Sequence, residues 1–134
     1  MTGSCHCGAV SVVAAHKPEY VNFCDCSLCA KSGGVWGYYE SAQVKVAGPT
    51  RAYRRLDYDK PAVEMHSCPT CGTTTHWHLT EHFEGDRVGV NVRIFKPSEL
   101  EGVEARFPDG RNWTGETEPS HRRAPGKLGQ DAFL

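Results

Sequence analysis

Residues 67–72 read SCPTCG and place two cysteines, Cys68 and Cys71, with two residues between them. Thiolates at this spacing can grip one zinc ion, because the turn between them points backbone N–H groups at the sulfurs. Gly72 permits the positive φ that such turns often need, and Pro69 stiffens the turn. A pair of this kind supplies half of a tetrahedral site, so two more ligands must come from elsewhere in the chain.

The natural complement lies near the N-terminus, where residues 3–8 read GSCHCG. Cys5 and Cys7 would close a four-thiolate zinc site together with Cys68 and Cys71. This site would join the start of the chain to its middle, so its binding energy would be folding energy. His6, between two of these ligands, is expected to point outward.

Residues 23–34 read FCDCSLCAKSGG and hold the other three cysteines, Cys24, Cys26 and Cys29. This spacing can place three thiolates on one zinc ion and leave its fourth position open, as catalytic zinc sites do. Such an ion suits a thiol as its fourth ligand and would deprotonate it, which favours thiol chemistry over hydrolysis. Two alternatives stay open, namely one structural site plus spare cysteines and a two-zinc cluster with bridging thiolates.

The bulk composition narrows the possible partners. The chain has 134 residues, the size of one domain, and a net charge of -1 from 15 basic and 16 acidic residues. This balance argues against nucleic acid as a partner. Without a run of about twenty apolar residues or a secretory signal pattern, we expect a cytoplasmic protein without a membrane partner. Thiols stay reduced there, so clustered cysteines favour metal over disulfides. The oligomeric state is not set by the sequence.

Short alternating runs separated by Gly, Pro and Asp predict a mainly β fold. The clearest is Arg87–Phe95, in which Val88, Val90, Val92 and Ile94 share the core face and the alternate residues face solvent or line something. The other expected strands are residues 9–13, 35–40, 44–47, 51–56, 62–67 and 73–79. Short helical turns are expected after Ser27 and from Pro97, with Ser98 as a possible cap of the second.

The cysteine motifs, taken in order, resemble those of the glutathione-dependent formaldehyde-activating enzyme (GFA) family, which is also grouped with centromere protein V. The resemblance is carried by GSCHCGAV, FCDCSLCAKSGG, SCPTCGTTTHW and RVGVNVRIF. It implies a GFA-like zinc-binding β domain over residues 1–107, built from small coiled β-sheets around a structural zinc. That fold is similar to the fold of the Rab guanine-nucleotide-exchange accessory factors. Residues 108–134, rich in Gly, Pro and charge, are expected to drape over the domain or to be partly disordered.

The same resemblance implies two zinc ions per chain. The structural ion is assigned to Cys5, Cys7, Cys68 and Cys71, and the ion tied to activity is assigned to Cys24, Cys26 and Cys29. The second ion is expected to be held more loosely, so that its site can be partly or wholly empty. The founding activity is the condensation of glutathione with formaldehyde to S-hydroxymethylglutathione, formally a carbon–sulfur lyase reaction. The implied partner is therefore a small thiol such as glutathione.

Two departures from the family pattern bear on that activity. Asp25 stands where many members have His, which adds negative charge beside the second zinc, and the chain is short for the founding enzyme. Two other functions therefore stay open. The chain could be a zinc- and thiol-binding module without turnover, or a protein-interaction domain.

Five residues are candidates for ligand binding. Asn91 and Arg93 share the polar face of the clearest strand, and Arg can take a carboxylate of glutathione with two parallel hydrogen bonds. His76 and His78 share a strand face and could reach a zinc ion or act in proton transfer. Trp36, just after the trio of cysteines, could wall a pocket. A solvated strand face or core packing is the alternative for each.

Overall fold

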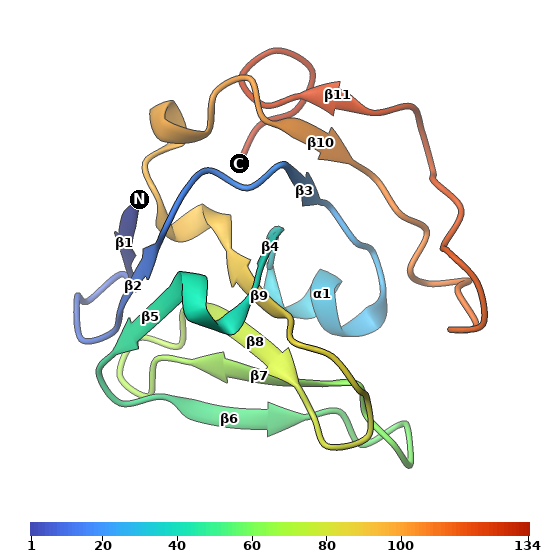
Figure 1. Ribbon diagram of the computed structural model, residues 1–134, viewed down its shortest axis with the longest axis horizontal. Helices are drawn as coiled ribbons and strands as arrows, with labels where there is room; N and C mark the ends of the chain where they lie inside the picture. Colours follow the sequence, from blue (N-terminus) through green and yellow to red (C-terminus); the bar gives the residue numbers. More distant parts are fainter.

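The computed structural model describes residues 1–134 and folds them into two β-sheets with one short α-helix (Figure 1). The smaller sheet has the order β1 (Thr2–Ser4), β2 (Ser11–Ala14), β5 (Val44–Ala47). The larger sheet has the order β11-β10-β3-β4-β9-β8-β7-β6, and only the pair β10–β3 is parallel. Its strands are β3 (Tyr20–Asn22), β4 (Trp36–Tyr39), β6 (Arg51–Arg54), β7 (Val63–Ser67), β8 (Thr74–Leu79), β9 (Val88–Asn91), β10 (Glu104–Arg106) and β11 (Gly126–Lys127). The predicted mainly β class is confirmed, whereas the likeness to the Rab accessory factors stays a prediction.

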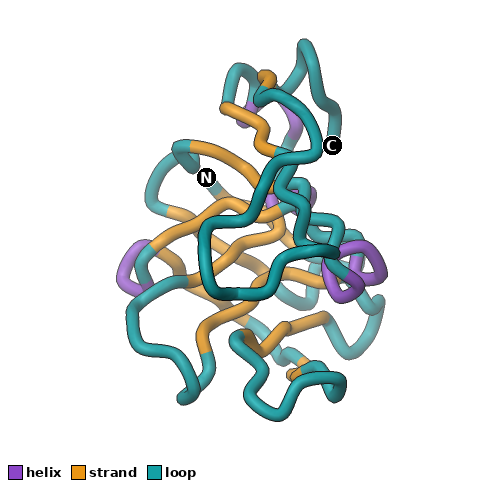
Figure 2. The backbone as a smooth tube through the Cα atoms, turned by 90° about the vertical axis from the view of Figure 1, so that its right-hand side faces the viewer, coloured by secondary structure: helices purple, strands orange, loops and turns teal.

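The main core joins the two sheets. Val12 of β2, Val21 of β3 and Val90 of β9 are all fully buried in one cluster, together with Leu100. Burying a side chain of this kind contributes roughly 1.5–3 kcal/mol each. Strands gather in the middle of the molecule, and loops account for much of the remainder (Figure 2).

The segment Arg87–Phe95 differs from its prediction as a single strand. Strand β9 ends at Asn91, and residues Val92–Ile94 form a 3₁₀ turn because the Asn91 side chain accepts a hydrogen bond from the Arg93 backbone N–H. The alternation also fails, since all four residues of β9 are buried. Gly89 is buried because the Trp77 ring fills the space that a Cβ would take. The predicted polar face therefore does not reach solvent along this strand.

The other elements follow their predictions with shifted ends. The helical turn after Ser27 is α1 (Ser27–Ser32), which ends where Gly33 adopts a positive φ of 68°. The second turn is a 3₁₀ helix over Pro97–Leu100, and Lys96 rather than Ser98 occupies its cap position. A further 3₁₀ turn spans Ser41–Gln43. The shortest strands, β1, β3, β10 and β11, were not anticipated, because two or three residues carry no readable alternation.

Parts of residues 108–134 lie against the rest of the chain. Strand β11 pairs antiparallel with β10, and Leu128 and Ala132 belong to the main core. Earlier in this segment, the backbone N–H of Arg122 donates a hydrogen bond to the carbonyl of Phe107. The domain boundary at residue 107 stays a prediction. None of the helices has the length and apolar character needed to cross a membrane.

Candidate metal centres

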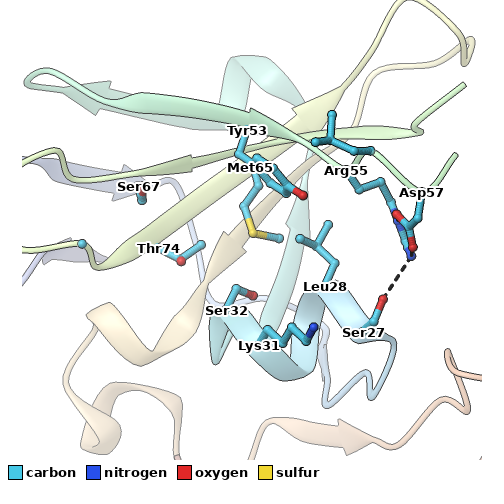
Figure 3. Close-up of a pocket in the computed structure, with 12 residues that line it drawn as sticks. Ser27, Leu28, Lys31, Ser32, Tyr53, Arg55, Asp57, Met65, Ser67 and Thr74 are labelled. Carbon is cyan, nitrogen blue, oxygen red and sulfur yellow. Dashed lines mark hydrogen bonds and ion pairs between the residues drawn. The ribbon is translucent and has the colours of Figure 1, made fainter. Parts of the chain in front are cut away.

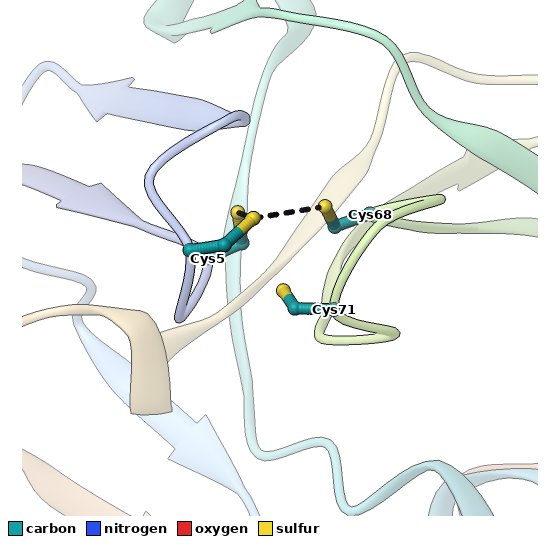
Figure 4. A group of neighbouring side chains, drawn as sticks. Cys5, Cys68 and Cys71 are labelled. Atoms are coloured by element: carbon teal, nitrogen blue, oxygen red, sulfur yellow. Dashed lines mark hydrogen bonds between the residues drawn. The ribbon is translucent and has the colours of Figure 1, made fainter.

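Four cysteines from two remote turns converge at the junction of the two sheets. Cys5 and Cys7 come from the β1–β2 connection, and Cys68 and Cys71 come from the β7–β8 connection. Figure 4 shows the labelled thiols of Cys5, Cys68 and Cys71 pointing toward one common centre. Sγ of Cys7 lies 3.6 Å from Sγ of Cys5 and 3.6 Å from Sγ of Cys68. We call this group the outer four.

Local backbone geometry aims these thiols. The Cys68 N–H donates to the Thr73 carbonyl, and the Gly72 N–H donates back to the Cys68 carbonyl, which closes a tight turn. Gly72 has a φ of 75° and Gly8 a φ of 81°, so both turns end in the positive-φ glycine that was predicted for Gly72. The Val10 N–H also donates to Sγ of Cys5 at 3.2 Å. The sulfurs are therefore positioned by the chain itself.

The outer four fit a tetrahedral metal ion. Metal–sulfur bonds of about 2.3 Å, the length found for zinc, separate the sulfurs of a tetrahedron by roughly 3.8 Å. The observed separations of 3.6 Å are close to that value. Cys5 and Cys68 are only 2% and 1% exposed, whereas Cys71 is half-buried and Cys7 is exposed. Four cysteine thiolates are the ligand set of closed, structural zinc sites.

Of the trio, Cys24, Cys26 and Cys29, the first two lie on the connection from β3 to α1, and Cys29 lies in the first turn of α1. Their sulfurs are all within 4.8 Å of one another, and no fourth Cys, His, Asp or Glu side chain joins them. Cys26 precedes α1 and its sulfur accepts a hydrogen bond from the Cys29 N–H at 3.5 Å. Sγ of Cys29 also accepts a hydrogen bond from the Trp36 indole Nε1–H at 3.2 Å. All three cysteines are half-buried.

The electrostatics of the trio suit a cation. The pKa of Cys26 lies far below its ordinary value because the thiols of Cys24 and Cys29 donate hydrogen bonds to its sulfur. The pKa of Cys29 is shifted in the opposite direction. Hydrogen bonding with Cys24 raises it most, followed by hydrogen bonding with Cys26 and by burial. The chain alone thus favours one thiolate of the three. A positive ion at the centre would let all three ionise, so the residues fit a metal.

The trio opens on a pocket of about 230 Å³. Cys24 and Cys29 line it together with Gly33, Gly34 and Arg93. Arg122 completes the wall from the C-terminal residues. Two cysteines and two arginines therefore line the same small volume.

Asp25, the negative charge noted beside the trio, is paired. Its carboxylate lies 3.3 Å from Nε of Arg122 and accepts a hydrogen bond from the Arg111 N–H at 3.2 Å. The C-terminal residues thereby offset the negative charge of Asp25 beside the trio. Arg122 was not among the predicted ligand-binding residues, since its proximity to Asp25 depends on how residues 108–134 fold back.

A larger pocket of about 580 Å³ lies on the other side of α1 (Figure 3). Leu28 and Lys31 of the helix face Tyr53, Met65 and other residues of the sheet across it. No cysteine lines this pocket, and its Arg55 is already bound to Asp57 at 2.6 Å. The smaller pocket is therefore the better candidate for chemistry, because it contains the sulfurs.

The predicted ligand-binding residues do not lie together in one site. Arg93 reaches the trio pocket, and Trp36 is 1% exposed and contacts the trio from the core through its indole. Asn91 is buried and bonds the backbone: its amide accepts from the Val35 N–H and donates to the Thr74 carbonyl. His76 and His78 lie on the face of β8 opposite Trp77, away from the trio. Their role as ligands stays a prediction.

Comparisons with known proteins agree with this geometry. The model of the family described as glutathione-dependent formaldehyde-activating enzyme matches residues 1–110. A curated relative from Halomonas elongata, provisionally named a glutathione-dependent formaldehyde-activating enzyme, is 36% identical over 83 residues, or 54% of this chain. The chain spans about half, 52%, of that relative's length. A crystal structure of a Rhodobacter sphaeroides protein is similar with a TM-score of 0.60 and 27% identity, over 72% of this chain and 88% of that one.

The fold and the cysteines define the class as a small β protein with two separate thiol clusters, each able to hold a metal ion. The family match covers residues 1–110 of the 134. The chain belongs to the glutathione-dependent formaldehyde-activating enzyme family.

Proposed function

We propose that the chain binds a structural zinc at the outer four and a second zinc at the trio, where a small thiol is joined to formaldehyde. The observation that carries this proposal is the trio pocket, which is lined by Cys24 and Cys29 together with Arg93 and Arg122. A zinc ion with three protein thiolates keeps one position for an exogenous ligand. The trio has no fourth protein donor of the usual kinds, which supports that open position.

The proposed substrate class is an acidic thiol such as glutathione. Arg93 is exposed, and none of the ion pairs within the chain involves it. Its planar guanidinium is suited to take a carboxylate with two parallel hydrogen bonds. Arg122 is partly engaged by Asp25 and adds positive charge to the same wall. Glutathione has two carboxylates, so it can place its thiol at the trio while one of them is bound by Arg93.

The reaction adds a thiol across the carbonyl of formaldehyde. A sulfur–carbon bond forms, the carbonyl π pair moves onto oxygen, and the oxygen takes up one proton to give a hydroxymethyl thioether. The thiol releases its own proton, so no oxidant or reductant is needed. An ion at the trio would supply the nucleophile by lowering the pKa of the incoming thiol. The chain contributes orientation by holding the carboxylate at Arg93, and the open pocket lets water carry the protons.

The test measures glutathione binding by calorimetry and adduct formation by NMR exchange, using protein whose zinc has been counted. We expect acceleration above the spontaneous reaction and weaker binding by Arg93→Lys, since Lys loses the planar fork. Arg51→Lys is the matched control, because Arg51 is exposed on β6 and lies outside the pocket. Binding without acceleration would instead favour a thiol-binding module. No binding at all would contradict the proposal and favour a protein-interaction domain.

A further inference from the structure

A third cluster of metal-ligating side chains lies on β7 and β8, apart from all seven cysteines. Glu64 and His66 alternate on β7, and the register places Glu64 opposite His78 and His66 opposite His76. These four side chains therefore share one face of the sheet. Met65 and Trp77, which lie between them in sequence, point to the other face and pack with Trp36. The cluster is thus on the reverse side of the sheet from the trio.

Three donor atoms of this cluster form a small triangle. Nε2 of His66 lies 2.9 Å from Nε2 of His78, and Oε1 of Glu64 lies 3.3 Å and 3.5 Å from these two nitrogens. Metal–ligand bonds of about 2.1 Å separate neighbouring donors by roughly 3.0 Å in octahedral and 3.4 Å in tetrahedral geometry. The observed triangle spans these values. An ion could therefore sit against all three atoms with little rearrangement.

The outer atoms of the same side chains are already held by other groups. Nδ1 of His78 faces the Leu79 carbonyl at 3.2 Å, and because a carbonyl only accepts, the proton belongs on Nδ1 and the lone pair on Nε2. Nδ1 of His66 contacts the Thr50 hydroxyl at 2.8 Å, and His76 stacks on the His66 ring. Partners of this kind orient the histidine ligands of metal sites and fix their tautomers.

Charge and exposure around the cluster also suit a cation. Nε of Arg54 donates to Oε2 of Glu64 at 2.6 Å, which leaves Oε1 turned toward the imidazoles. The same guanidinium binds Glu81 at 2.7 Å, so two carboxylates surround one positive charge. The His78 side chain is 42% exposed, against 14% for His66 and 19% for Glu64, so the triangle is open to solvent on one side.

We propose that Glu64, His66 and His78 form a third metal site for a divalent first-row transition ion such as Zn²⁺ or Co²⁺. Two imidazoles and one carboxylate are a recurrent ligand set for such ions and leave further positions to water or a substrate. The site is independent of the thiol chemistry proposed for the trio. A direct hydrogen bond from Nε2–H of one ring to Nε2 of the other is the competing arrangement, and it predicts no metal affinity.

The test adds Co²⁺ to protein whose cysteine centres are already loaded with zinc. Binding is followed by calorimetry and by visible absorption, because cobalt held by N and O donors lacks the charge-transfer band of cobalt held by thiolates. We expect one additional Co²⁺ ion per chain, without the thiolate band. Removal of a supporting partner alone costs about 10–100-fold in metal affinity, so loss of a ligand in His78→Gln or Glu64→Gln should cost more than about 100-fold.

Matched controls come from neighbouring residues outside the triangle. His82→Gln and Glu81→Gln change an adjacent imidazole and a carboxylate on the same Arg54, and they should retain the additional ion. Circular dichroism and the zinc count show that each variant is folded. The proposal is overturned if wild type takes up no additional Co²⁺, if the bound cobalt shows the thiolate band, or if His78→Gln and Glu64→Gln bind as tightly as their controls.

Discussion

The outer four and the trio are both built from cysteine thiols, but they differ in sequence separation and in burial. The outer four come from turns more than sixty residues apart, and two of their members are almost fully buried. The trio falls within six residues of sequence, and its three members are half-buried beside a pocket. A metal ion that links remote segments stabilises the fold, because the unfolded chain cannot assemble the site. An ion that links adjacent residues adds little to the fold and is free to bind ligands.

The largest expected effect follows from loss of one outer thiol. Cys68→Ser should leave the protein insoluble or unfolded, because structural zinc contributes roughly 10–16 kcal/mol of apparent binding free energy in small domains. Soluble yield and thermal unfolding measure this effect. An unchanged melting temperature in Cys68→Ser would contradict the structural role given to the outer four.

Loss of a trio thiol should be milder. Cys26→Ser removes the sulfur that holds the start of α1, yet the buried core and the outer four do not depend on it. We expect a folded protein whose zinc count falls from two toward one, with thiol binding lost. In wild type, limited chelator should likewise remove the trio ion first. A variant that keeps two ions, or a chelator that empties the outer four first, would reverse these roles.

Contact between the trio and the C-terminal residues can be tested at Gly110. A Cβ there would overlap Sγ of Cys24 and crowd Cys26. Gly110→Ala should therefore displace the trio thiols at a cost of about 1–3 kcal/mol, typical of overpacking, and weaken binding of the second ion. Zinc competition with a chelating dye measures this change. Unchanged affinity would show that residues near 110 move aside freely.

The smallest effect is expected at Trp36. Trp36→Phe keeps an aromatic ring in the core but removes the Nε1–H that donates to Sγ of Cys29. Lost hydrogen bonds of this kind cost about 1 kcal/mol, and lost supporting partners weaken metal sites by about tenfold or more. The second ion should therefore be released faster while the outer four stay loaded. Trp113→Phe changes an exposed ring outside the trio pocket and is the control. It should leave the release rates of both metal ions unchanged.

Much of the site was predictable from local sequence. The spacing of Cys68 and Cys71, and the glycine after them, requires a particular turn whatever surrounds it, and Gly72 adopts the expected positive φ. The helix after Ser27 and the close spacing of the trio also follow from short-range patterns, and the expected joining of the two remote cysteine pairs is seen in the fold. Strand ends were less predictable, because β9 stops where a single side chain, Asn91, bonds the backbone.

Cross-strand and chain-end contacts were decided only by the tertiary structure. His78 was noted in the sequence, but Glu64 and His66 join it only because β7 and β8 pair in one register, and a shift of one residue would turn them to opposite faces. Likewise, Arg122 reaches Asp25 across 97 residues through the folding back of the C-terminal segment. The sequence by itself determined which neighbouring thiols could share an ion, since bond geometry fixes that over a few residues, whereas the fold joined the two remote pairs of the outer four. Which charges and imidazoles surround them depended on strand register and packing, which are set by the whole core.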